Sequence, residues 1–320
     1  MKPGLRKSLR NILFLIISLA LLWISFRGID FGRLGEILRK ADYLWLIGSI
    51  AISVIAFFIR ARRWILLIEP MGYNPSLKNT YHSLMTGYFA NLIFPRLGEI
   101  TRCAALGKKE KLPFDRLVGT VIVERTIDLL TVIVILGLML AAGSGATDSF
   151  LSQSLIAPLS MKISSLFGSS TFIYLLILAL ALISVTLYFA LRKTLSGKPF
   201  FRKIYSFGDG IIDGLKSIAS LKRKWEFIIL TVLLWIAYLL MAFLPLFCLE
   251  STGGIGISGA LFILVIGSFG MAVPVQSGIG AYHWIISRGL LVVYGIPLEE
   301  GLAYATLSHE SQLLVIAILG

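Results

Sequence analysis

Charged residues occur inside one of the most apolar parts of this sequence. The stretch "ANLIFPRLGEITR", residues 90–102, interrupts an apolar run with a proline and continues with Arg, Gly, Glu and Arg. An arginine guanidinium can hold a phosphate through two parallel hydrogen bonds, so this pattern predicts an anion site beside a broken helix. The candidate binding residues here are Asn91, Pro95, Arg96, Gly98, Glu99 and Arg102.

Two of these residues also have simpler interpretations. The side chain of Arg102 could extend to the lipid headgroups without binding a ligand. Glu99 could complement a helix N-terminus as a first-turn acid, or it could carry a proton that an anionic substrate displaces. The sequence leaves these alternatives open.

A second charged motif, "VERTID", lies inside a long apolar run. Glu124 and Asp128 share a helix face at spacing i,i+4, and Arg125 lies one turn from Asp128. Charges at this depth must face the protein interior, because each costs a few kcal/mol in hydrocarbon. We predict that these residues act on a substrate or form ion pairs with Arg96 or Arg102.

A second interrupted stretch, "GSFGMAVPVQSGIGAYHW", occupies residues 267–284, and "LSHESQ" follows near the end of the chain. His283 could titrate near neutral pH, although a lone histidine is more often a hydrogen-bonded packing residue. The candidate binding residues of this region are Pro274, Gln276, Ser277, Gly278, Gly280, His283, Arg288, His309 and Glu310.

The sequence predicts no cofactor, no metal centre and no enzyme active site. Cys103 and Cys248 have no histidine or second cysteine at ligand spacing, so we expect buried packing residues without a disulfide. The Walker, HExxH and GxSxG motifs are absent from the sequence. If the protein uses energy, that energy must therefore come from a gradient across the membrane.

The composition indicates a membrane protein. The 320 residues are 57% hydrophobic and only 15% charged, which is too apolar for one soluble core. Apolar runs long enough for a bilayer of about 30 Å predict six crossings. These runs are residues 11–26, 44–59 (short, but extendable at either end), 117–141, 171–191, 226–249 and 303–320.

Lysine and arginine gather at the ends of these runs. With a cytoplasmic N-terminus, the inner segments 1–10, 60–116 and 192–224 carry 23 of the 30 basic residues, including those of "RARRW". The net charge of +13 then reflects the positive-inside rule rather than nucleic-acid binding. We expect a multi-pass protein of the cell (inner) membrane with its N-terminus in the cytoplasm.

The first interrupted stretch is too short to cross the bilayer. Residues 81–94 reach about 20 Å at a helical rise of about 1.5 Å per residue. A crossing here would also place the basic segment 192–224 outside. We therefore predict a re-entrant hairpin that bends at residues 94–96, beside protein or a water-filled cavity.

The chain also contains an internal repeat. Gly87 matches Gly267 at an offset of 180 residues, Pro95 matches Pro274 at 179, and "LIEPMG" matches "CLESTG" at 181. Each half has three crossings and one hairpin, so the second half must insert upside down. We predict one integral membrane domain, residues 1–320, with inverted repeats at 11–141 and 171–320.

These features predict an all-α polytopic membrane protein with six transmembrane helices and two re-entrant broken-helix hairpins. In inverted-repeat transporters such hairpins enter from opposite faces and meet near the midplane. We expect half-helices beginning after Pro95 and Gly278 to direct free backbone N–H groups into one cavity that favours anions. The amphipathic stretches 29–43 and 204–224 are expected to connect helices at the membrane interface.

Four motifs together resemble a known family: "RARRW", "NLIFPRLGEITR", "VERTIDLL" and "PVQSGIGAYHW". The resemblance is to the flippase-like transmembrane region of lysylphosphatidylglycerol synthetases and their stand-alone relatives. It implies movement of a lipid between leaflets. The soluble aminoacyl-transferring domain is not part of these residues, so lysyl transfer is not expected. Relatives usually carry a Pro-Gly-Gly turn followed by a glutamate, where this chain has residues 276–280 and His283.

Three functions are consistent with these observations. The first is a flippase for an anionic or phosphate-bearing lipid or lipid-linked intermediate, with membrane lipid as its partner. The second is an ion-coupled transporter of a soluble anion that uses the same cavity. The third is a non-transporting partner of an envelope-lipid biosynthetic enzyme. A homodimer is also left open.

Overall fold

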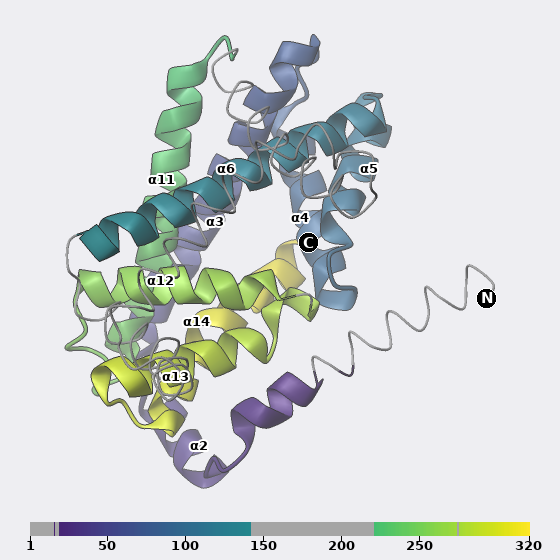
Figure 1. Cartoon of the computed structure of the whole chain (residues 1–320). Helices are drawn as coiled ribbons and strands as arrows, with labels where there is room; N and C mark the ends of the chain where they lie inside the picture. The colour runs from purple at the N-terminus through teal and green to yellow at the C-terminus, as the bar shows by residue number, and fades with distance from the viewer. Residues whose placement is uncertain (1–15, 17–18, 142–220, 274) are drawn as a thin grey trace, which may run out of the picture.

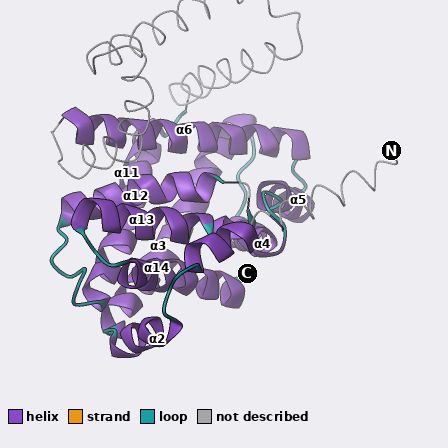
Figure 2. Cartoon of the chain, turned by 60° about the horizontal axis from the view of Figure 1, so that its bottom comes forward, coloured by secondary structure: helices purple, strands orange, loops and turns teal. Residues whose placement is uncertain are grey.

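The chain is described by a computed structural model that covers residues 16, 19–141, 221–273 and 275–320. All regular structure in these ranges is helical, as Figures 1 and 2 show, so the expected all-α class is confirmed for the described part. The predicted span 171–191, the stretch 204–220 and Pro274 lie outside the described residues.

The helices that frame the molecule have the following bounds. After a helical segment at residues 19–26 come α2 (Phe31–Lys40), α3 (Tyr43–Ile68), η1 (Glu69–Met71), α4 (Leu77–Ile93), α5 (Gly98–Glu110), α6 (Phe114–Ala141), α11 (Lys224–Phe243), η3 (Leu244–Cys248), α12 (Ile257–Ala272), η4 (Gln276–Gly278), α13 (Ala281–Tyr294) and α14 (Leu298–Leu319).

Three helical segments are long and apolar enough to cross a membrane: Tyr43–Met71, Lys224–Cys248 and Leu298–Leu319. The chain is therefore a helical membrane protein. Helix α6 has 28 residues, which is about 42 Å at the usual rise, but Glu124, Arg125 and Asp128 make it less apolar. The total of six crossings remains a prediction.

Helix α3 corrects one expected boundary. The sequence predicts a short span over residues 44–59 that could extend at either end, with "RARRW" in a cytoplasmic loop, but the helix continues through "RARRW" to Ile68. The helix begins where Asp42 accepts a hydrogen bond from the backbone N–H of Leu44, 3.0 Å away. It continues through the basic residues because Arg60 and Arg63 are buried inside the protein. These two arginines are not loop charges.

Helices α3 and α11 lie side by side in Figure 1 and run in opposite directions. At the start of α3, the backbone N–H of Asp42 donates to the carbonyl oxygen of Cys248 at 2.9 Å. At its other end, Arg62 Nε donates to Glu226 Oε1 at 2.9 Å. The pair forms an antiparallel frame to which the other helices attach.

The first interrupted stretch folds into a hairpin of α4 and α5. Helix α4 ends at Ile93, the chain turns through residues 94–97, and α5 begins at Gly98. At the base, Asn79 Nδ2 donates to Glu110 Oε1 at 2.7 Å, which holds the pKa of the Glu110 carboxyl below its usual value. The predicted bend at residues 94–96 is confirmed.

Two glycines allow α4 and α5 to pack with their backbones in contact. A Cβ atom on Gly98 would lie 2.3 Å from the carbonyl oxygen of Gly87, and a Cβ on Gly87 would lie 2.7 Å from that of Gly98. Real Cβ atoms do not approach backbone oxygens so closely. The hairpin closes only because both positions lack a side chain.

The second interrupted stretch forms a hairpin of α12 and α13. Its turn contains three residues with positive φ: Ser277 at 45°, Gly278 at 80° and Gly280 at 81°. A Cβ on Gly280 would lie 2.6 Å from the backbone nitrogen of Leu22. The helical segment 19–26 therefore packs directly on this turn, and Ser25 Oγ donates to the carbonyl oxygen of Gly280 at 2.9 Å.

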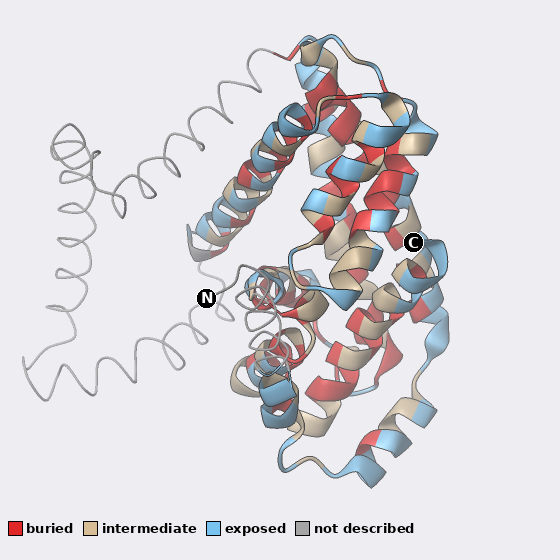
Figure 3. Cartoon of the chain, turned by 90° about the vertical axis from the view of Figure 1, so that its right-hand side faces the viewer, coloured by how far each residue is buried: buried red, intermediate tan, exposed pale blue. Residues whose placement is uncertain are grey.

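The two hairpins start at opposite ends of the α3–α11 frame. The first follows the end of α3 and η1, and the second follows the end of η3, which pairs with the start of α3. Their turns meet, because Arg96 Nη2 donates to the carbonyl oxygen of Ala272 at 2.8 Å. Figure 3 shows the buried residues along the helix faces that point inward. The largest buried cluster joins α11, α12, α13 and α14.

The glycine contact in the first hairpin can be tested by substitution. We expect Gly98→Ala to destabilise the protein by about 1–3 kcal/mol, since the added methyl group overlaps the backbone of α4. Gly119→Ala in α6 is the matched control, because open space surrounds Gly119. Thermal unfolding in detergent measures both. Equal melting temperatures for the two variants would contradict the backbone contact.

Candidate functional site

The place where the two hairpin turns meet is called the tip junction here and comprises residues 94–97, 272–273 and 275–280. Arg96 crosses this junction from the first turn to Ala272 at the end of α12. It is exposed and has a φ of 60°, in the left-handed region that a non-glycine residue seldom adopts. Such backbone strain is concentrated at functional sites.

One expectation about this junction needs correction. The sequence predicts free backbone N–H groups at the start of both half-helices. In the structure, Asn91 Oδ1 accepts a hydrogen bond from the backbone N–H of Gly98 at 2.7 Å, so this donor is already used. The second half-helix begins at Ala281, not directly after Gly278, and no side chain caps it.

A buried ion cluster lies behind the first hairpin and is defined by Arg60, Arg63, Arg102, Glu124 and Asp128. Glu124 Oε1 accepts from Arg60 Nε at 2.9 Å, and Glu124 Oε2 accepts from Arg102 Nη2 at 2.8 Å. Asp128 accepts from Arg63 Nη2 at 2.5 Å and from Arg60 Nη2 at 3.2 Å. The cluster joins α3, α5 and α6.

The cluster decides between the two interpretations of Arg102, which were a contact with the lipid headgroups and a role inside the protein. Arg102 is buried and pairs with Glu124, so it does not extend to the headgroups. The predicted ion pair between "VERTID" and the hairpin is therefore confirmed for Arg102. Arg96 takes its partner from α12 instead.

Positive charge is in excess inside this cluster, since three guanidinium groups face two carboxylates. Within this cluster, four buried nitrogens have no hydrogen-bond partner: Nε and Nη1 of Arg63 and of Arg102. Aromatic rings cover part of this charge. The guanidinium carbon of Arg102 lies 4.7 Å from the centre of the Trp64 ring, and that of Arg63 lies 5.8 Å from the Phe227 ring.

A second ion pair lies at the exposed edge of the cluster. Arg125 Nη2 donates to Glu99 Oε1 at 2.8 Å, and Arg125 Nη1 lies 3.7 Å from Asp128 Oδ2. The expectation that all three "VERTID" charges face inward is wrong for Arg125, whose side chain is 42% exposed. Its length lets it reach Glu99 at the start of α5 from the exposed face of α6.

A separate polar group lies at the second hairpin. His309 and Glu310 of α14 approach His283 of α13, and His309 Nε2 lies 2.9 Å from the carbonyl oxygen of Ser277. His283 is therefore not an isolated packing residue. Gln276 belongs to η4 beside these groups, whereas Arg288 lies on an exposed face of α13.

Sequence reasoning missed Arg60 and Arg63. Their assignment to a cytoplasmic loop hid the i,i+3 spacing that places both on one face of α3. Tyr238 was also missed, and its hydroxyl oxygen accepts a hydrogen bond from Arg60 Nη1 at 2.9 Å. Only knowledge that α3 continues past residue 59 would have revealed this face.

An apolar cavity of about 390 Å³ lies between α6, α11 and α12. None of its lining residues belongs to the tip junction. Its wall includes Phe227, whose ring faces Arg63, and Ile127, which precedes Asp128 in sequence. The cavity therefore starts beside the buried ion cluster. Its lining residues are Ile127, Thr131, Ile135, Phe227, Ile228, Thr231, Val232, Trp235, Ile236, Leu239, Leu261 and Leu264.

Comparison with known proteins identifies the family. Residues 11–320 match the family described as "Lysylphosphatidylglycerol synthase TM region". The chain belongs to this family. The resemblance noted from the four sequence motifs is thus confirmed, and the protein is a multi-pass membrane protein.

Two curated proteins are similar to this member of the lysylphosphatidylglycerol synthase TM region family. A UPF0104 membrane protein of Methanocaldococcus jannaschii is 27% identical over 125 residues, which are 38% of this chain and 37% of that protein. The glycosyltransferase AglD of Haloferax volcanii is 25% identical over 141 residues, 43% of this chain and 22% of its own length. The match thus covers well under half of either relative. No solved structure matches the chain significantly.

The buried ion cluster of this family member predicts a large effect at Glu124. We expect Glu124→Gln to destabilise the protein by about 3–5 kcal/mol, since it leaves buried arginines without a counter-charge. Glu226→Gln at the partly exposed Arg62 pair is the control, with an expected loss of about 1 kcal/mol or less. Thermal unfolding in detergent measures both.

A double variant separates charge from packing. Glu124→Gln combined with Arg102→Gln should recover part of the lost stability, because one unpaired cation is removed with the acid. If Glu124→Gln is no more harmful than Glu226→Gln, the cluster does not hold α3, α5 and α6 together.

Proposed function

We propose that this protein moves an anionic, phosphate-bearing lipid or lipid-linked intermediate between the two leaflets of the cell membrane. The observation that carries the proposal is the tip junction. Two broken-helix hairpins start at opposite ends of the α3–α11 frame and meet where Arg96 reaches Ala272. Broken helices that meet inside a membrane protein are the usual location of transporter substrate sites.

The charges near the junction support an anionic headgroup. Arg96 is exposed, and its described partner is a neutral carbonyl oxygen, so its charge is not matched by an acid. The buried ion cluster behind it holds three arginines and two acids. An anion entering here meets a positive field, and a guanidinium can hold its phosphate through two hydrogen bonds.

The apolar cavity supports a lipid over a soluble anion. It lies between three helices and begins beside the Arg63–Asp128 pair. A hydrocarbon chain seated there would lie beside the buried ion cluster. A soluble anion has no hydrocarbon chain that could pack against this apolar lining.

The element order supports two inverted repeats, residues 11–141 and 171–320. In the first, α3 and η1 lead into the α4–α5 hairpin and then α6. In the second, α11 and η3 lead into the α12–α13 hairpin and then α14. Opposed repeats provide two similar arrangements of one site, one open to each side. The N-terminus is assigned to the cytoplasm by the distribution of basic residues.

The family comparison also favours a lipid. The family takes its name from a synthase of lysylphosphatidylglycerol, and the relative from Haloferax volcanii is named a glycosyltransferase. The matched segments cover a minority of each curated relative. The lipid substrate is therefore inferred for this chain from its own arginines and cavity.

Lipid exchange in liposomes tests the proposal. The full chain is reconstituted with a fluorescent anionic phospholipid, and an impermeant quencher reports how fast the lipid changes leaflet. We expect Arg96→Asn to slow exchange by roughly 10- to 100-fold, since a charged hydrogen bond contributes about 1.5–3 kcal/mol. Asparagine tolerates a positive φ, so the turn is retained. Arg96→Lys keeps the charge and should lose less.

Arg116→Gln is the matched control, because Arg116 is exposed at the start of α6, outside the tip junction. Its exchange rate should equal that of the unchanged protein. Exchange no faster than in protein-free liposomes, or unaffected by Arg96→Asn, would exclude the lipid proposal. Uptake of radiolabelled phosphate without lipid exchange would instead indicate transport of a soluble anion. No transport of either kind would favour a partner of an envelope-lipid enzyme.

A further inference from the structure

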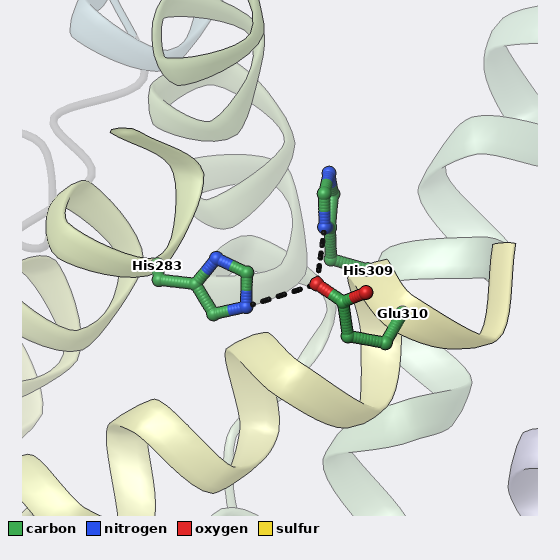
Figure 4. A group of neighbouring side chains, drawn as sticks. All are labelled: His283, His309 and Glu310. Carbon is green, nitrogen blue, oxygen red and sulfur yellow. Dashed lines mark hydrogen bonds and ion pairs between the residues drawn. The ribbon is translucent and has the colours of Figure 1, made fainter. Parts of the chain in front are cut away.

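We propose that His283, His309 and Glu310 form a binding site for a divalent transition-metal cation of the zinc type. The three residues come from two helices, α13 and α14. Figure 4 shows both imidazole rings directed at the same carboxylate oxygen. His309 Nδ1 lies 3.2 Å from Glu310 Oε1, and His283 Nε2 lies 3.4 Å from the same atom.

The hydrogen bonds of His309 define which nitrogen is free for a ligand. Its Nε2 lies 2.9 Å from the carbonyl oxygen of Ser277, which can only accept a hydrogen bond. Nε2 therefore carries the hydrogen in the neutral ring, and Nδ1 has a bare lone pair. This lone pair would face an anionic oxygen, so the arrangement needs either a proton on Nδ1 or a metal cation between the two atoms.

A metal ion fits the two nitrogen–oxygen distances of this group. Zinc binds imidazole nitrogen and carboxylate oxygen at about 2.0–2.2 Å, and in a tetrahedron two such ligands lie about 3.3 Å apart. The two nitrogen–oxygen separations here are 3.2 and 3.4 Å. All three ligand atoms lie within 4.8 Å of one another. Two neutral imidazoles and one carboxylate also suit a borderline divalent cation.

The surroundings orient His309 as metal sites usually do, whereas the second ring nitrogen of His283, Nδ1, is buried without a hydrogen-bond partner. A ligating histidine usually donates its second N–H to a carbonyl or carboxylate, and Ser277 supplies that acceptor to His309. The Tyr282 ring stacks on His309 with centroids 4.9 Å apart, and the His283 ring contacts His309 edge-on at 5.3 Å. The hydrogen bond and the stacking orient the His309 ring, and the edge-on contact places the His283 ring against it.

The site has an open side. Both histidines are almost fully buried, whereas the side chain of Glu310 is 41% exposed. Three protein ligands with one free position are the arrangement of zinc sites that bind water or a substrate oxygen. A bound cation would also tie the Ser277 turn of the second hairpin to α14. The inference does not depend on the proposed lipid transport.

Metal binding by the full chain tests this inference. The protein is purified in detergent with a histidine-free tag, treated with a chelator and dialysed against Zn²⁺, and bound zinc is counted by mass spectrometry. We expect one retained zinc ion per chain and a rise in melting temperature with added Zn²⁺. Co²⁺ in place of Zn²⁺ should give the visible absorption of a four-coordinate site.

The three histidines of the chain provide matched variants. His283→Asn and His309→Asn should each weaken zinc binding by roughly 100-fold or more, which exceeds the usual loss from an outer-shell residue. His82→Asn should bind like the unchanged protein, because His82 is exposed on α4. Glu310→Gln adds an independent variant that keeps the side-chain volume.

Two outcomes would overturn the inference. One is zinc binding that does not saturate. The same conclusion follows if more than one ion binds per chain and the binding is unchanged in His283→Asn and His309→Asn. The other is no retained zinc, in which case the three residues share a proton only. Size-exclusion elution identifies variants that do not fold, and zinc titration of the unchanged protein then decides the question alone.

Discussion

Glu124 is the residue on which the arrangement of the first half of the protein depends. Its carboxylate is fully buried and accepts hydrogen bonds from Arg60 and Arg63 of α3 and Arg102 of α5. Charges in such a place must keep their partners, since an unpaired buried ion costs several kcal/mol. One acid on α6 therefore fixes α3 and the second arm of the first hairpin relative to each other. The exposed turn at Arg96 is built on this fixed support.

Local sequence signals were sufficient for the broken helices. Pro95 has no backbone N–H to donate and disfavours a helical conformation at the residue before it, so the turn at residues 94–97 was visible in the sequence. The apolar runs likewise gave the helical membrane class. In contrast, the end of α3 was misplaced, because Arg60 and Arg63 resemble interfacial charges when α6 is not considered. Their burial results from partners more than 60 residues away.

Contacts between residues far apart in the sequence also explain why the group of His283, His309 and Glu310 was not predicted. His283 and His309 are 26 residues apart and lie on different helices, so no spacing rule for metal ligands connects them. What the sequence did show was their two elements, a broken hairpin and a long helix. Which faces these elements turn toward each other depends on small residues, such as Gly301, where a Cβ would lie 3.1 Å from Ser287 Cα. Such close approaches are set by three-dimensional packing, not by periodicity.

The contact between residues 19–26 and Gly280 has a consequence for motion. Leu21 and Leu22 lie directly against the backbone of Gly280. The Ser25 hydroxyl donates a hydrogen bond to the carbonyl oxygen of Gly280. The two segments cannot slide past each other without losing this bond and opening a void. A shift of the second hairpin relative to residues 19–26 would therefore break this hydrogen bond and open the contact at Gly280.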